Sequence, residues 1–140
     1  MTLDDHELLA RLRQSRYAVV ATLGPNGAPQ AATVGFAATD ERELVFDTLT
    51  STRKWHNIQR DARVAVVVTE GETTFQLEGV ADTPSGAAHE RLLAAYLAVF
   101  PDGAERLQAP GIMHVRVTIR WLRYTDYREA EPVIVERTFA

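Results

Sequence analysis

The segment 112–121 alternates apolar and polar residues without interruption, and this pattern limits the fold most. Side chains of a β-strand point to opposite faces in turn, so an alternation of this length predicts a strand with one face on a core. The expected inward residues are Met113, Val115, Val117, Ile119 and Trp121. The chain is therefore expected to form at least one long strand, with one face of the sheet packed on a hydrophobic core.

Shorter segments of the same kind surround this strand. Strands are expected at 16–23, 29–39, 43–48, 62–69, 73–82 and in a last extended stretch, with short helices at 3–14, 51–61 and 86–100. The run 62–69 is continuously apolar, which is typical of a strand buried on both faces. Tight turns join the strands, so the sheet is mostly antiparallel. A sheet of this length in a small domain is expected to curl into a barrel.

Size and composition exclude several classes of protein. The chain has 140 residues, and we expect one domain over 1–140. It has no cysteine, which excludes disulfides, thiolate metal sites and thiol catalysis. The net charge of −4 gives no basic field for nucleic acid. We find no apolar run long enough for a membrane and no signal-peptide pattern, so a cytoplasmic location is expected.

Common catalytic motifs are missing from the sequence. Its glycines form no GxGxxG or phosphate-loop pattern, and no serine lies in a nucleophile elbow. The histidines fall on different elements without metal-ligand spacing, so no metal site is expected.

The helix expected at 51–61 has an unusual start. With Thr50 or Ser51 as its N-cap, Arg53 and Lys54 lie in the first turn, where the helix dipole disfavours cations. Lys54 is also the only lysine of the chain. A bound anion explains this arrangement, because hydroxyls, free backbone N–H groups and two cations converge on one phosphate. The hydroxyls belong to Thr48, Thr50, Ser51 and Thr52. The alternative is that both cations are solvated surface charges.

The strand expected at 29–39 carries Ala31, Ala32 and Gly35, which are poor strand formers. Small residues within a strand often mark the close approach of a ligand or of another backbone.

The segment "LVFDTLTSTRKWHNIQRDARVAVVV" resembles the central part of the pyridoxamine 5′-phosphate oxidase-like, FMN-binding split-barrel proteins. "GAPQAATVGF" before it and "FQLEGVA" after it follow the same order. The resemblance implies a mainly β (α+β) fold: a six-stranded antiparallel split β-barrel with short flanking helices. It also implies a homodimer with two flavin sites at the subunit interface.

The same resemblance assigns roles to individual residues. Thr48, Thr52, Arg53 and Lys54 would hold the cofactor phosphate, with Ser51 beside them. Thr33, Val34 and Gly35 would face the flavin ring, partly through backbone groups. Thr74 and Gln76 would approach from the other subunit, and Trp121 and Arg123 would reach the pocket from the last part of the barrel.

Two motifs of the true oxidases are absent. Their phosphate-binding arginine on the second strand has no counterpart in "QAATVGF", and their substrate motif near the C-terminus is missing from "RWLRYTDYREAE". These departures argue against vitamin B6 oxidase activity and leave two cofactors open. The resemblance implies FMN, and a deazaflavin, which also carries a phosphate, is the alternative.

Three functions are consistent with these features. The first is an FMN- or deazaflavin-dependent oxidoreductase that transfers hydride to or from a small organic substrate. The second is a non-catalytic flavin- or haem-binding module, for which His56 and His114 are the histidines near the barrel. The third is a structural or sensor dimer. A homodimer is expected in each case, because the apolar faces of 62–69 and 113–121 exceed what three short helices can cover.

Overall fold

The computed structural model describes residues 3–140. In chain order, the elements are α1 (Asp5–Leu12), β1 (Tyr17–Leu23), β2 (Pro29–Gly35), β3 (Ala37–Ala38), β4 (Glu43–Leu49), α2 (Arg53–Arg60), β5 (Arg63–Glu70), β6 (Thr73–Asp82), α3 (Gly86–Val99), α4 (Gly103–Arg106), β7 (Ile112–Asp126) and β8 (Val133–Thr138). The short helix α4 was not expected from the sequence. None of the helices within 3–140 has the length and apolar character needed to span a membrane.

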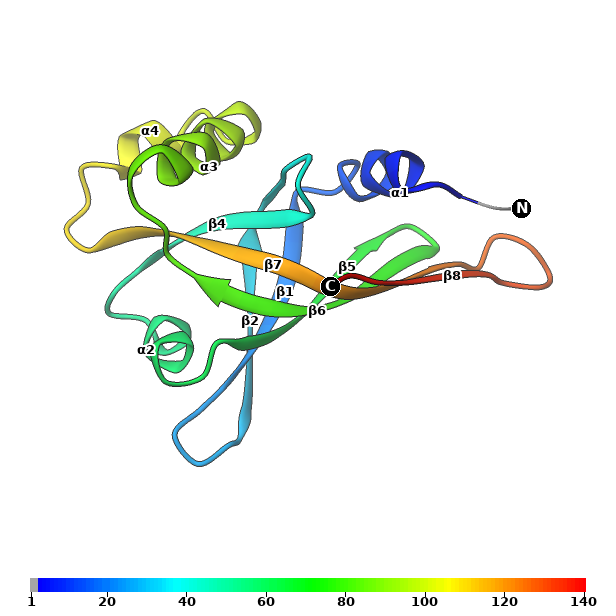
Figure 1. The fold of residues 1–140 in the computed structure, drawn as a ribbon, viewed down its shortest axis with the longest axis horizontal. Coiled ribbons are helices and arrows are strands. Elements are labelled where there is room, and N and C mark those ends of the chain that lie inside the picture. The colour runs from blue at the N-terminus through cyan, green and yellow to red at the C-terminus, as the bar shows by residue number, and fades with distance from the viewer. Residues whose placement is uncertain (1–2) are drawn as a thin grey trace.

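All strands belong to one antiparallel sheet in the order β2-β1-β5-β6-β7-β4-β3, with β8 paired to the second half of β7. The sheet curls into a half-barrel flanked by short helices (Figure 1), which confirms the predicted split barrel. The strand count differs from six, because the stretch 29–39 breaks at Phe36 and β8 adds a strand at the end.

Two hydrophobic cores lie on opposite sides of the sheet. The larger core fills the concave side, where Leu8 and Leu12 of α1 and Ile58 of α2 pack on the strands. The smaller core forms where α3 packs on the outer side of β3 and β4, through Leu92, Tyr96 and Phe100 on Ala37 and Val45. In Figure 1, α3 and α4 lie over β4 and the start of β7. Within residues 3–140, no helix covers the outer side of β1 and β5, and on β2 only Phe100 at the end of α3 reaches Gly35.

The prediction that strand 62–69 is buried on both faces is wrong. Val64, Val66 and Val68 of β5 are buried, whereas Ala65 is exposed and Val67 keeps 44% of its surface. The reason is that none of the elements described between residues 3 and 140 covers the outer side of β5. An apolar run predicts a strand, but it does not show what lies against its second face.

A β-bulge changes the predicted direction of Trp121. Glu78 pairs with Trp121 and Gly79 pairs with Ile119, so Arg120 is an extra residue in β7. The inward side therefore moves from Val115, Val117 and Ile119 to Leu122 and Tyr124 beyond the bulge. Trp121 lies on the outer side and is half-buried, which corrects the expectation that it shares a face with Ile119.

The bulge depends on a glycine in the neighbouring strand. A Cβ atom at Gly79 would overlap the backbone carbonyl of Thr118 on β7. Only a residue without a side chain allows the two strands to approach this closely.

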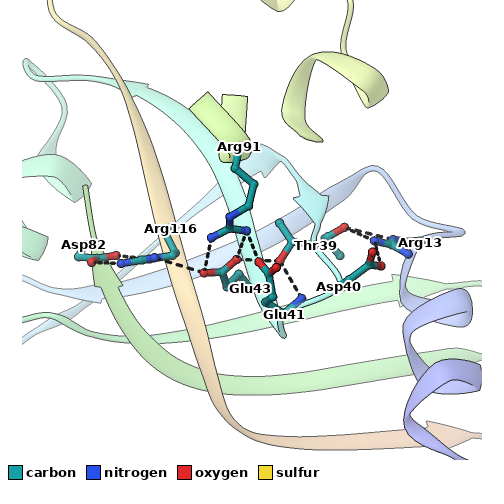
Figure 2. Close-up of polar contacts among 9 residues, drawn as sticks. Arg13, Thr39, Asp40, Glu41, Glu43, Asp82, Arg91 and Arg116 are labelled. Carbon is teal, nitrogen blue, oxygen red and sulfur yellow. Dashed lines mark hydrogen bonds and ion pairs between the residues drawn. The ribbon is translucent and has the colours of Figure 1, made fainter. Parts of the chain in front are cut away.

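A buried carboxylate links α3 to three strands (Figure 2). Glu43 is 6% exposed and accepts hydrogen bonds from Arg91 at 2.7 and 3.1 Å, from Thr39 at 2.8 Å and from Arg116 at 3.3 Å. Arg116 also donates to Asp82 at 2.6 Å. Burial alone would raise the pKa of Glu43, but the hydrogen bonds and the two arginine charges outweigh it and lower the pKa. The cluster is fully paired and holds α3 against the sheet.

Candidate functional site

The start of α2 lies at the end of β4, beside the β1–β2 pair (Figure 1). Its N-cap is Thr52, one or two residues later than predicted. The Thr52 hydroxyl accepts from the Trp55 N–H at 3.3 Å and donates to the Leu49 carbonyl at 2.9 Å. The tripeptide Thr50-Ser51-Thr52 offers three possible caps, and the position of the Leu49 carbonyl selects the last one.

The hydroxyls of Thr48 and Thr52 are used within the protein. Their oxygens lie 3.0 Å apart. A hydroxyl carries one proton, and that of Thr52 points to Leu49, so Thr48 is the donor in this pair. Thr48 is also buried at 6% exposure. These two residues therefore shape the loop, whereas Ser51 is exposed at its surface.

Arg53 and Lys54 face a small cavity at the start of α2. The cavity has a volume of about 110 Å³ and is bounded on the other side by β1 and β2, through Val20, Thr22, Gln30, Ala31 and Ala32. Within residues 3–140, no hydrogen bond or ion pair at this helix start involves the side chain of Arg53 or Lys54. Two unpaired cations and the positive end of the helix dipole thus meet at one cavity, and this combination favours an anion.

Asn57 fixes α2 to the floor of this cavity, and sequence reasoning missed it. Its side chain is 2% exposed, and its amide nitrogen donates to Thr22 at 2.9 Å and to Gln30 at 2.8 Å. Its carbonyl oxygen accepts from Arg60 at 2.6 Å. The only signal in the sequence is a polar residue next to Ile58 on the inner side of the helix. Asn57 sets the position of Arg53 and Lys54 relative to β2.

The outer side of the sheet brings together the other predicted residues. One row across the strands contains, by register, Thr33, Val19, Val67, Gln76 and Arg123. The next row contains Ala31, Ala21, Ala65, Glu78 and Trp121. Thr74 lies on the same side of β6 as Gln76. The site residues predicted on separate strands therefore share one surface of the sheet. None of the predicted residues on this surface lines the cavity at Lys54.

This outer surface is apolar where β1 and β5 meet. Val19 and Val67 are direct neighbours and are 42% and 44% exposed, and Tyr17 is 62% exposed. The strand 113–121 contributes Trp121 to this side, whereas Val115, Val117 and Ile119 face the inner core and do not add to the surface as expected.

Val34 and Gly35 have different surroundings from Thr33. The Val34 side chain belongs to the inner core at 8% exposure, so only its backbone can face a ligand. A Cβ at Gly35 would lie 2.7 Å from the ring of Phe100. The glycine is thus explained by the packing of Phe100 over β2.

The two histidines near the barrel differ in access. His56 is exposed on α2. His114 is 5% exposed, lies 3.2 Å from a ring nitrogen of His89 and packs edge-on against Tyr96. Burial, and then the neighbouring His89, lower the pKa of His114. The described residues contain no group of three or more potential ligands placed for a metal ion.

The fold and the site together define an antiparallel split barrel with two unpaired cations facing a cavity at a helix start and an open apolar outer face. Residues 4–126 match the pyridoxamine 5′-phosphate oxidase family, and the chain belongs to this family. This confirms the resemblance seen in the sequence.

Individual relatives agree with this assignment. The chain is 36% identical over 103 residues to a pyridoxine/pyridoxamine 5′-phosphate oxidase of Rubrobacter xylanophilus, covering 72% of this chain and 46% of that protein. It thus spans about half the length of this curated relative.

Two solved structures share the fold at low sequence identity. A haem-binding protein from Mycobacterium smegmatis matches with a TM-score of 0.81 at 18% identity, over 99% of this chain and 60% of that one. A pyridoxamine 5′-phosphate oxidase-related, FMN-binding protein from Nostoc punctiforme matches over 100% of both chains with a TM-score of 0.71 at 18% identity.

Proposed function

We propose that the chain binds FMN and acts as a flavin-dependent oxidoreductase on a small organic molecule. The observation that carries this proposal is the pair Arg53 and Lys54, which face a cavity at a helix start without a described partner. Membership of a family named for a flavin-dependent oxidase supports it, as does the FMN-binding relative of equal length.

Each part of the site would have a distinct task. Arg53 and Lys54 would pair with the phosphate, and the N–H groups of the first turn of α2 would donate to its oxygens. Asn57 would keep this helix start at a fixed distance from β2, and Ser51 would add an exposed hydroxyl. The bound flavin would supply the hydride chemistry, and the chain would bind and orient it.

A homodimer completes the proposal. The uncovered surface around Tyr17, Val19 and Val67 is continuous with the row that carries Thr33 and Gln76. A two-fold contact would bury both copies of this surface at once. It would also bring Thr74 and Gln76 of one protomer toward the site of its partner.

The absorption spectrum of the purified protein, with and without added cofactor, tests this function. The apoprotein is titrated with FMN, with a phosphate-bearing deazaflavin and with haem. We expect saturable binding of FMN with one molecule per chain. Preferred binding of the deazaflavin would replace FMN in the proposal. A Soret band with no flavin binding would overturn it and favour the haem-binding alternative, with exposed His56 as the ligand to test.

A further inference from the structure

Another, larger cavity lies on the concave side of the sheet, between α1, the middle of β7 and Phe139 just after β8. Its volume is about 490 Å³. This volume falls within the range of about 300–1,000 Å³ that is common for small-molecule pockets. Its walls are mainly apolar and come from Leu8, Leu9, Leu12, Phe75, Ile119, Leu122 and Phe139. None of these residues belongs to the site at the start of α2.

The charged side chains at the mouth of this cavity leave one positive charge unpaired. Asp5 pairs with Arg137 at 3.1 Å, and Asp40 pairs with Arg13 at 3.0 Å (Figure 2). Arg42 is the remaining charged residue in the wall, and none of the ion pairs or side-chain hydrogen bonds described within 3–140 includes it. The two carboxylates are therefore compensated, and one positive charge is left. His6 is exposed at the same rim.

The fold holds Arg42 over the cavity. Its φ of 61° lies in the left-handed region, which disfavours residues other than glycine. The Arg42 carbonyl accepts from the Ile119 N–H at 3.0 Å, which anchors the turn. The guanidinium lies 4.4 Å from the centre of the Phe139 ring. Stacking explains the position of the side chain but leaves its charge without a counter-ion.

We propose that this cavity binds a small molecule with one carboxylate and a medium-length apolar chain. The apolar walls would remove the chain from water, and Arg42 would pair with the carboxylate at the mouth. A neutral or cationic amphiphile lacks this pairing. The site is separate from the proposed flavin site, so either can exist without the other.

Isothermal titration calorimetry with decanoate tests the proposal, with decanol and decyltrimethylammonium as probes of equal chain length. We expect saturable binding of decanoate at one per chain and weaker binding of the other two. Arg42→Gln should lower decanoate affinity about tenfold, the effect of losing one charge-assisted hydrogen bond. Arg120→Gln is the matched control, since it removes an exposed arginine that has no described side-chain partner within 3–140 and lines neither cavity, and it should leave decanoate binding unchanged.

A cavity-filling variant provides a second test. Leu9→Trp places a larger side chain on a partly buried wall and should weaken all three probes, with the melting temperature reporting on the fold. Three results would overturn the proposal: no saturable decanoate binding, equal affinity for decanoate and decanol, or an equal effect of Arg42→Gln and Arg120→Gln.

Discussion

Replacing Asn57 by leucine should destabilise the protein strongly, although the two side chains are similar in size. The Asn57 amide is buried and donates to Thr22 at 2.9 Å and to Gln30 at 2.8 Å. Leucine leaves both acceptors without this donor. The loss costs about 1–3 kcal/mol at buried Thr22 and less at half-buried Gln30, which water can reach. Arg60 is exposed and can return to water. We therefore expect a loss of about 2–4 kcal/mol, which corresponds to a fall in melting temperature of roughly 10 °C at this chain length.

Urea unfolding of the apoprotein at fixed protein concentration measures this loss. Gln59→Leu is the matched control, because Gln59 is exposed on the same helix, and should change stability by less than about 0.5 kcal/mol. A double-mutant cycle with Gln30→Leu isolates the contact, and we expect a coupling energy of about 1 kcal/mol or more. Additive effects of Asn57→Leu and Gln30→Leu, or a cost of Asn57→Leu equal to that of Gln59→Leu, would refute the reasoning.

Three further predictions follow from the sheet. Val67→Glu should convert a dimer into a monomer of 15.6 kDa in light scattering, whereas Leu107→Glu at the C-cap of α4 should not; a wild-type monomer would contradict the proposed interface. Glu43→Gln should cost about 2 kcal/mol near neutral pH, because it breaks a buried pair whose arginines remain partly solvated. Since the pKa of Glu43 is lowered on folding, the difference from wild type should shrink as pH falls below the model-peptide value of 4.5, and a pH-independent difference would argue against the pair. Gly79→Ala should cost about 2 kcal/mol or more through overlap with Thr118 and should change Trp121 fluorescence, so an unperturbed variant would contradict the bulge.

Strand periodicity and turn chemistry predicted the antiparallel barrel because both act locally. Alternation along a strand indicates which residues share a face, as for Val115, Val117 and Ile119 of β7. A continuously apolar run such as 62–69 does not show what covers its second face, so the exposure of Val67 could not be derived. The direction of Trp121 was missed for a related reason: the bulge depends on the contact of Gly79 with the neighbouring strand.

The candidate site was predictable where the sequence departs from helix preferences. Arg53 and Lys54 stand out because cations are unfavourable in a first turn. The hydrogen bonds that hold this helix start in place were not predictable, because Asn57 donates to residues that are 27 and 35 positions away in the chain. The choice of Thr52 as N-cap likewise depends on where the chain turns after Leu49.

The most direct test of the proposed phosphate site compares FMN with riboflavin, which lacks the phosphate, by fluorescence titration. Lys54→Ala should weaken FMN binding roughly ten- to a hundred-fold, the effect of losing a charge-assisted hydrogen bond of about 1.5–3 kcal/mol, with riboflavin binding and the melting temperature unchanged. Arg53→Ala should act in the same way, and Arg42→Gln is the control that should leave both ligands unaffected. Rising salt should weaken FMN binding to wild type, because ions screen such exposed charges. Equal affinities of wild type and Lys54→Ala for FMN, in a variant that remains folded, would contradict the account.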